Sequence, residues 1–131
     1  MKKITKNVNR YVDGFVLAVP EKNLPAYKKM ALEGGKVWKK YGALEYFECV
    51  GDDMSPEMNG AEFVKFPKTV NAKPGEVIVF SFIVFKSRAH RDSVNAKVMK
   101  EFMQDPKNKE KEMPFDMKRM AYGGFKTLVV L

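Results

Sequence analysis

The stretch that decides the fold of this chain runs Val77-Ile78-Val79-Phe80-Ser81-Phe82-Ile83-Val84-Phe85. It has the length of one strand, and only Ser81 interrupts its apolar side chains. A continuous apolar run of this kind indicates a strand that is buried on both faces, whereas a strand with one wet face alternates between apolar and polar residues. The stretch therefore predicts a central strand in a sheet whose two faces are both covered.

The segments on either side supply the rest of a small α+β fold. Strand-forming residues occupy 11–19, 43–50 and 122–131, and apolar residues recur at helical spacing over 23–41 and 87–103. The order strand, helix, strand, strand, helix, strand predicts a ferredoxin-like βαββαβ domain with an antiparallel sheet. Two helices cover only one face of that sheet. A second copy would cover the other face with its own sheet, roughly 10 Å away, so we expect a homodimer that forms a dimeric α/β barrel.

Three segments are expected to lie outside this scaffold. Residues 1–10 predict an N-terminal arm, and residues 11–131 predict one domain of ordinary size. The segment 51–75 contains three prolines and is long for a connection, so it either covers a binding site or packs against a partner subunit. Within it, Phe63 to Phe66 predict a short edge strand. The charged residues of 104–112 predict a solvated loop or a frayed helix end.

Composition narrows the classes of function. The net charge is +8, and the basic side chains are scattered along the chain, which is typical of a soluble cationic surface. One cysteine, Cys49, and one histidine, His90, argue against a zinc or other metal site, so neither metal nor cofactor is expected. We expect Cys49 to be a small buried apolar residue. No apolar run is long enough to span a membrane and no secretory signal precedes the first strand, which predicts a cytoplasmic protein.

Several motifs resemble those of one family of small bacterial proteins. They read Tyr11-Val12-Asp13-Gly14-Phe15, Gly42-Ala43-Leu44-Glu45-Tyr46, Lys86-Ser87-Arg88-Ala89-His90-Arg91-Asp92, Val94-Asn95-Ala96-Lys97-Val98-Met99, Met113-Pro114-Phe115-Asp116, Lys118-Arg119-Met120 and Tyr122-Gly123-Gly124-Phe125. Together they resemble the YbaA-like family, which is classed as a domain of unknown function. The resemblance implies membership of the dimeric α/β-barrel superfamily, which includes cofactor-free monooxygenases, haem-handling proteins, dismutating enzymes and proteins without known activity. It implies no catalytic residues, because the family carries no settled activity.

His90 is the natural candidate for acid–base catalysis, because imidazole alone among side chains has an ordinary pKa near neutrality. It shares a helix face with Val94 and Val98, which would turn it toward the sheet. Arg88 and Arg91 lie within one helical turn of it and could hold an anionic ligand group, such as a carboxylate or phosphate. Structural roles explain the same residues: packing for the histidine, and ion pairs with acidic side chains for the arginines.

A second candidate group combines a carboxyl group with phenols. Tyr46 and Glu48 share one face of the strand over 43–50, where they could meet Tyr122 or Arg119 from the approach to the last strand. A buried carboxylate beside a phenol would be a proton-handling pair and would help to line a binding site. Half-buried polar side chains at a dimer seam explain the same pattern.

These candidates predict a protein that binds or transforms a small organic molecule, and the resemblance implies that its pocket lies between the helices and the sheet. One alternative is a structural or regulatory dimer without catalysis. Another is RNA binding, because the stretch Phe80 to Phe85 matches the spacing of the stacking aromatics in an RNA-recognition domain, with Phe15 as a first-strand partner. Ile78 and Val79, however, replace the basic residue and glycine of that motif, and base stacking needs an open sheet face. The sequence therefore argues against a nucleic-acid partner.

Overall fold

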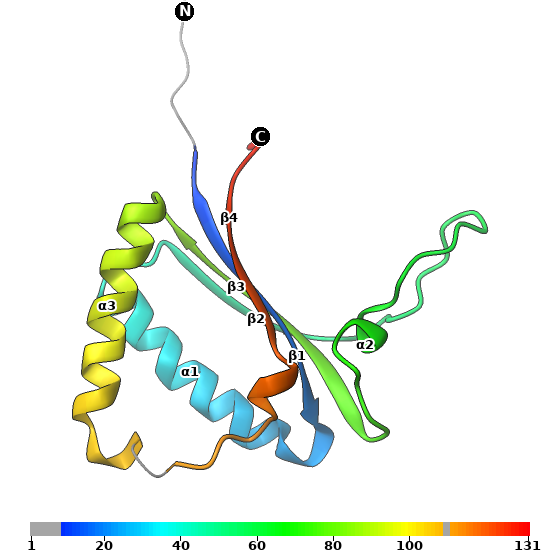
Figure 1. Cartoon of the computed structure of the whole chain (residues 1–131), viewed down its shortest axis with the longest axis horizontal. Coiled ribbons are helices and arrows are strands. Elements are labelled where there is room, and N and C mark those ends of the chain that lie inside the picture. Colours follow the sequence, from blue (N-terminus) through cyan, green and yellow to red (C-terminus); the bar gives the residue numbers. More distant parts are fainter. Residues whose placement is uncertain (1–8, 109–110) are drawn as a thin grey trace, which may run out of the picture.

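The computed structural model describes residues 9–108 and 111–131 and confirms the ferredoxin-like α+β fold (Figure 1). The strands are β1 (Tyr11–Pro20), β2 (Glu45–Val50), β3 (Glu76–Phe85) and β4 (Ala121–Lys126). The helices are α1 (Leu24–Lys40), α2 (Phe66–Thr69) and α3 (Arg88–Gln104). The sheet has the order β2-β3-β1-β4, and each neighbouring pair is antiparallel. The predicted arm lies almost wholly outside the described residues.

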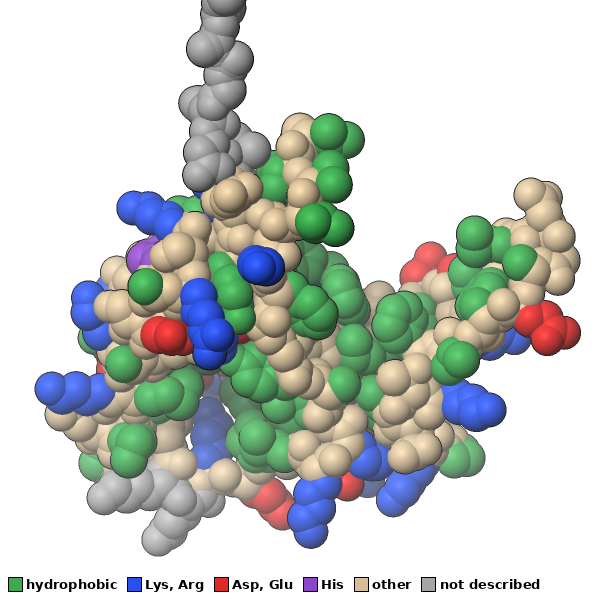
Figure 2. Space-filling model, turned by 45° about the horizontal axis from the view of Figure 1, so that its top comes forward, with side chains coloured by type: hydrophobic (Ala, Val, Ile, Leu, Met, Phe, Trp, Pro, Cys, Tyr) green, Lys and Arg blue, Asp and Glu red, His purple; other side chains and the backbone are tan. Residues whose placement is uncertain are grey.

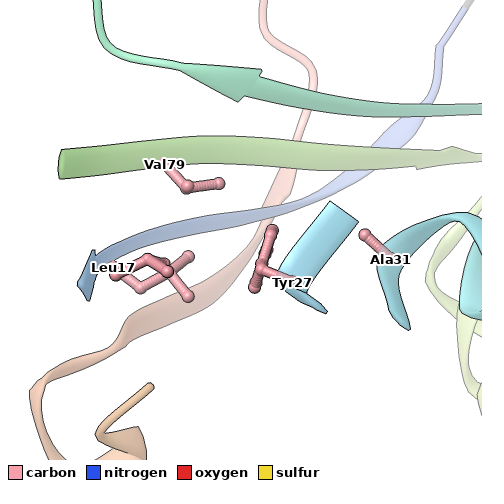
Figure 3. Close-up of a cluster of buried hydrophobic side chains, with 5 residues drawn as sticks. Leu17, Tyr27, Ala31 and Val79 are labelled. Atoms are coloured by element: carbon pink, nitrogen blue, oxygen red, sulfur yellow. The ribbon is translucent and has the colours of Figure 1, made fainter. Parts of the chain in front are cut away.

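The apolar stretch of β3 is central, as predicted, because β1 and β2 pair with it on its two edges. Both long helices, α1 and α3, pack on the same face of the sheet (Figure 1). Figure 3 shows Leu17 and Val79 of the sheet beside Tyr27 and Ala31 of α1. A second buried cluster joins the sheet to α3 and consists of Ala43, Ile83, Phe85, Val94 and Val98.

Residues that commonly cap helices stand at the ends of α1 and α3, and all but one of them act as caps. Ser87 caps α3, and its Oγ accepts a hydrogen bond from the backbone N–H of His90 at 3.1 Å. Gly42 follows α1 with a φ of +117°, a conformation that glycine adopts without strain. Asn23 precedes α1 but makes no side-chain cap. Its Nδ2 instead donates to the carbonyl oxygen of Pro114 at 3.0 Å, which ties the start of α1 to the segment before β4.

The segment between β2 and β3 covers one end of the sheet face that the helices leave open. Val70 is buried against Ala18 and Ile78 on that face. The predicted edge strand at 63–66 is wrong, because the backbone enters the short helix α2 at Phe66. Pro67 stands in the first turn of that helix, where its missing N–H removes no hydrogen bond.

The remainder of this face, which we call the open face, is apolar and uncovered by any part of the chain that the structure describes. Phe47, Phe80 and Phe125 are 47%, 44% and 62% exposed. The ring of Phe47 stacks on that of Phe82, with centroids 4.8 Å apart. Figure 2 shows hydrophobic side chains gathered between the body of the molecule and the projecting segment that leads to α2. Cys49 also lies on the open face and is exposed, so its predicted burial is wrong for the single chain.

Candidate functional site

A cavity of about 230 Å³ lies between the helices and the sheet, where the family resemblance implied a pocket. Its walls come from β1, β2 and β3, from the inner stripe of α1, from the end of α3 and from the segment before β4. Gly34 leaves space in the wall that a larger side chain would fill. The apolar lining consists mainly of Phe15, Leu17, Met30, Trp38, Phe102, Met113, Phe115 and Met120.

The polar lining is concentrated in one hydrogen-bonded group, the Tyr27–Glu48–Tyr46 group. Tyr27 Oη donates to Glu48 Oε1 at 2.7 Å. Tyr46 Oη lies 3.0 Å from Glu48 Oε2 and 2.9 Å from the carbonyl oxygen of Ala31 in α1. Ser81 of β3 adds a hydroxyl group to the lining. The group therefore links helix α1 to the edge strand β2 at the wall of the cavity.

The electrostatics of this group follow from its apolar surroundings. Burial raises the pKa of Glu48, whereas the hydrogen bonds from Tyr27 and Tyr46 oppose that rise. The pKa values of both tyrosines are raised as well, chiefly by burial. The lining contains no lysine or arginine. As a residue Glu48 is exposed, because it stands on an edge strand beside the cavity, so its carboxyl group is accessible to a ligand.

A second hollow of about 540 Å³ lies between α1 and β2. It shares Tyr27, Ala31, Tyr46 and Glu48 with the first cavity. The Tyr27–Glu48–Tyr46 group therefore lies between the two hollows and lines both of them.

A different carboxyl group forms the other polar cluster of the helix-covered face. Asp13 of β1 is 1% exposed and lies 3.4 Å from Arg91 Nη1 of α3 in an ion pair. Tyr122 Oη donates to Asp13 Oδ2 at 3.2 Å and accepts from Arg91 Nη1 at 3.0 Å. Asn95 Nδ2 of α3 lies 3.5 Å from the same oxygen, at the limit for a hydrogen bond. Tyr11 Oη accepts a hydrogen bond from Arg91 Nη2 at 3.2 Å. This Asp13–Arg91 cluster is absent from the lining of both hollows.

His90 and Arg88 stand at the start of α3, apart from the cavity. The Nδ1 atom of His90 accepts a hydrogen bond from the backbone N–H of Lys86 at 2.9 Å, and its ring packs edge-on against Phe85. Burial lowers the pKa of His90, which favours neutral imidazole. Its packing toward the sheet agrees with the predicted helix face. The catalytic role of His90 stays a prediction, and Arg88 is exposed.

Arg119 belongs to neither polar group. Its guanidinium binds the carboxylate of Glu76 through two hydrogen bonds of 2.8 and 2.7 Å and also donates to Asp116 at 3.2 Å. A further bond of 2.9 Å reaches the carbonyl oxygen of Asn71. Arg119 therefore joins the segment before β4 to the start of β3.

The predicted site residues are thus divided among separate places. Tyr46 and Glu48 meet each other at the cavity, whereas Tyr122 meets Arg91 in the Asp13–Arg91 cluster. Sequence reasoning missed Tyr27, which lies within the range 23–41 that was interpreted only as a helix with an apolar face. It also missed Asp13, although a carboxylate among alternate apolar residues of a buried strand is a signal that a charged partner must lie opposite.

Comparison with known proteins places the chain in a family. Residues 10–117 match the family model described as "Protein of unknown function (DUF1428)". The chain belongs to this family. Its DUF1428 relatives include "Uncharacterized protein YbaA" of Escherichia coli strain K12 and the protein of the same name from Shigella flexneri. Each is 41% identical over 122 residues, which cover 92% of this chain and 97% of the relative. The YbaA-like resemblance is confirmed.

A solved structure supports the fold of this DUF1428 protein. The chain is similar to a dimeric ferredoxin-like protein from an uncultured marine organism, with a TM-score of 0.52 and 15% sequence identity. The similarity covers 94% of this chain and 97% of the other. Within 9–108 and 111–131, no helix is both long and apolar enough to cross a membrane.

Proposed function

We propose that this DUF1428 protein is a cytoplasmic homodimer that binds a small organic molecule in the cavity between its helices and its sheet. The observation that carries the proposal is the apolar cavity with the Tyr27–Glu48–Tyr46 group as its main polar feature. Small-molecule sites typically combine an apolar lining with a few converging polar groups. A volume of about 230 Å³ suits a molecule with one ring, since an apolar cavity of about 150 Å³ accommodates benzene.

The homodimer is supported by the open face. An exposed apolar surface that extends across four strands is unusual in a monomer and is typical of an interface. A second copy presents the same apolar surface, and two such sheets can pack face to face. The similar solved protein, described as dimeric and ferredoxin-like, agrees with this arrangement.

The open face favours a second copy over RNA. Its outward-facing strand residues, at alternate positions of the four strands, include no lysine or arginine. Contacts with phosphates supply much of the affinity of nucleic-acid binding, and base stacking alone lacks that contribution. The exposed rings of Phe80 and Phe125 therefore suit protein packing better than base stacking.

The pocket can be tested by fluorine NMR with 4-fluorotoluene as the probe. We expect the wild-type protein to broaden and shift the probe signal, and the Gly34→Leu variant to abolish this effect, because the added side chain fills the cavity beside Trp38. Ala89→Leu is the matched control, since it adds a leucine at an exposed position of α3. Equal binding by all three proteins would contradict the proposed pocket.

The dimer can be tested by light scattering over a dilution series. The proposal predicts a mass of about 30 kDa, twice the 15.0 kDa of the chain. Phe80→Glu on the open face should yield monomers, whereas Met99→Glu on α3 should not, although both residues are 44% exposed. A wild-type monomer at all concentrations would contradict the homodimer and leave the pocket to be judged separately.

A further inference from the structure

One buried hydroxyl group in the cavity has no partner. Ser81 of β3 is 4% exposed and lines the cavity. Its side chain makes no hydrogen bond to any residue within 9–108 or 111–131. A polar group in apolar surroundings without a hydrogen bond costs free energy, and a ligand that supplies the missing bond recovers it. The hydroxyl group of Ser81 therefore points to a ligand with a polar group.

Glu48 stands directly beside Ser81. The two residues are partners in the register between β2 and β3, and both line the cavity on the helix-covered side of the sheet. Side chains at such partner positions have Cβ atoms about 5 Å apart. One ligand group can therefore reach the carboxyl group of Glu48 and the hydroxyl group of Ser81 at the same time.

The carboxyl group of Glu48 has donors but no cation. Tyr27 and Tyr46 donate hydrogen bonds to its two oxygen atoms, which favours the ionised carboxylate. In the part of the chain that the structure describes, Glu48 makes no ion pair, although Lys28 lines the second hollow. A carboxylate can accept about four hydrogen bonds, and the phenols occupy two of these places. The remaining places suit a donor that carries positive charge.

From this geometry we infer that the cavity binds a small primary amine in its ammonium form, with the nitrogen between the carboxylate of Glu48 and the hydroxyl group of Ser81. The inference rests on the proposed function and names the class of ligand for the same cavity. An ammonium group has three N–H donors, which suffice for both acceptors. The apolar part of the amine, a single ring, would lie among the aromatic side chains of the lining.

The aromatic walls of the cavity favour such a cation. The rings of Trp38 and Phe102 meet edge to face with centroids 5.8 Å apart, and the ring of Trp38 lies 6.1 Å from that of Tyr46. All three residues line the cavity. The face of an aromatic ring attracts a cation, most strongly for tryptophan, and also packs well against the ring of a ligand.

The same surroundings disfavour an anion. A bound carboxylate would lie near the carboxylate of Glu48, and the lining contains no lysine or arginine that could balance the two charges. A neutral alcohol avoids this repulsion but gains neither the charge of Glu48 nor the attraction of the rings. The expected order of affinity is therefore amine, then alcohol, then carboxylate.

The test compares three probes that share one aromatic ring: benzylammonium, benzyl alcohol and benzoate. Binding is measured at neutral pH by NMR of ¹³C-labelled methionine methyl groups. Met30, Met113 and Met120 line the cavity and report on binding, whereas Met58 and Met99 lie elsewhere and serve as references. We expect benzylammonium to bind about tenfold more tightly than benzyl alcohol, the lower end for a hydrogen bond to a charged group, because the carboxyl group is accessible to water.

Glu48→Gln removes the charge and keeps an acceptor oxygen. It should bring the affinities for benzylammonium and benzyl alcohol to within about threefold of each other, while its retained binding of benzyl alcohol shows that the cavity is intact. Glu45→Gln is the matched control. It makes the same change at an exposed position of the same strand, and its side chain lies on the other side of the sheet. The control should retain the preference for benzylammonium.

Ser81→Ala removes the hydroxyl group without a partner. We expect benzylammonium to bind about three to five times more weakly to this variant, the effect of one lost hydrogen bond. The stability of the unliganded protein toward urea should stay close to that of wild type, because no hydrogen bond within the protein is lost. Unchanged affinity for benzylammonium would overturn the placement of its nitrogen beside Ser81.

The outcomes distinguish the ligand class from the pocket itself. Binding of benzyl alcohol or benzoate by wild type as tightly as benzylammonium would overturn the amine inference and leave the pocket standing. A full preference for benzylammonium in Glu48→Gln would show that the charge of Glu48 is not used and would also overturn it. If none of the probes shifts the signals of Met30, Met113 and Met120, the proposed function itself fails.

Discussion

Two carboxyl groups face the helices from the same sheet, but they differ in exposure and in the charge of their partners. Asp13 is buried, with 1% of its surface exposed, and its charge is balanced by the guanidinium of Arg91. Glu48 is accessible on an edge strand, and its partners in the group are the uncharged phenols of Tyr27 and Tyr46. Burial raises the pKa of both carboxyl groups, but only Asp13 has a cation that opposes the rise.

This difference indicates which of the two carboxyl groups is accessible to a ligand. A sealed ion pair exchanges neither protons nor ligands, so the Asp13–Arg91 cluster holds α3 to the sheet. A carboxyl group without a cation, beside open space, can meet a ligand and respond to it. The contrast between partners, rather than burial alone, therefore distinguishes the structural carboxyl group from the one that we propose to be functional.

The largest expected effect comes from breaking the ion pair. Asp13→Ala leaves the charge of Arg91, whose side chain is 15% exposed, without its buried partner. We expect the free energy of unfolding to fall by about 3–5 kcal/mol, as for other buried pairs that lose one member. Urea denaturation followed by circular dichroism measures this change. A loss below about 1 kcal/mol, the value typical of a surface pair, would remove the structural role assigned to Asp13.

A matched pair of tyrosine variants sharpens the comparison. Tyr122→Phe removes a hydrogen bond to the buried Asp13, and Tyr27→Phe removes one to Glu48, which is exposed. Water can replace a lost partner of an exposed carboxyl group but not of a buried one, so we expect losses of about 2 and about 1 kcal/mol of unfolding free energy, respectively. The same urea experiment decides the order. A larger loss for Tyr27→Phe would contradict the contrast between a buried and an accessible carboxyl group.

A third carboxyl group, that of Glu76, is a useful control because its pKa is lowered, whereas those of Asp13 and Glu48 are raised. Its two hydrogen bonds from Arg119 lower its pKa from 4.5 to about 2. The stabilisation is present above the ordinary pKa and is lost as the pH falls toward the lowered one. The stability difference between wild type and Arg119→Gln should therefore shrink in acid. Thermal unfolding at a series of pH values tests this, and a constant difference would show that the ion pair does not stabilise the fold.

The smallest effect is expected for Glu48→Gln. A carboxyl group whose pKa is raised by folding stabilises the native state less as the pH rises from the ordinary glutamate value through the raised one. Glutamine does not titrate. The variant should therefore match wild type in acid and become slightly more stable relative to it as the pH increases. A variant that loses stability as the pH rises would indicate an ionised, favourably paired Glu48.

The sequence predicted the scaffold well because its signals are local and periodic. The apolar stretch of β3 located the central strand, and helical spacing over 87–103 located α3. The site was predicted only in part. Tyr46 and Glu48 share a strand face, and alternation alone reveals that. Tyr27 reaches Glu48 only because α1 lies across β2, and helix placement over a sheet is a tertiary property that periodicity does not encode.

The errors have a similar cause. Cys49 was predicted to be buried because a free cysteine usually behaves as a small apolar residue, yet nothing in the described part of the chain covers its face. Tyr122 was expected near Glu48, but β4 lies at the opposite edge of the sheet from β2. Strand order, which sets these neighbours, is decided by long-range pairing rather than by any single segment.

The most direct test of the account is the protonation state of Glu48. Carboxyl ¹³C NMR of the protein labelled at glutamate Cδ would follow each glutamate through a pH titration, with Glu48→Gln used to assign the signal. The account predicts that the Glu48 signal titrates above the ordinary range of a glutamate, whereas that of Glu76 titrates below it. A Glu48 signal that titrates within or below the ordinary range would contradict the effect of burial on Glu48, and with it the contrast between the two carboxyl groups.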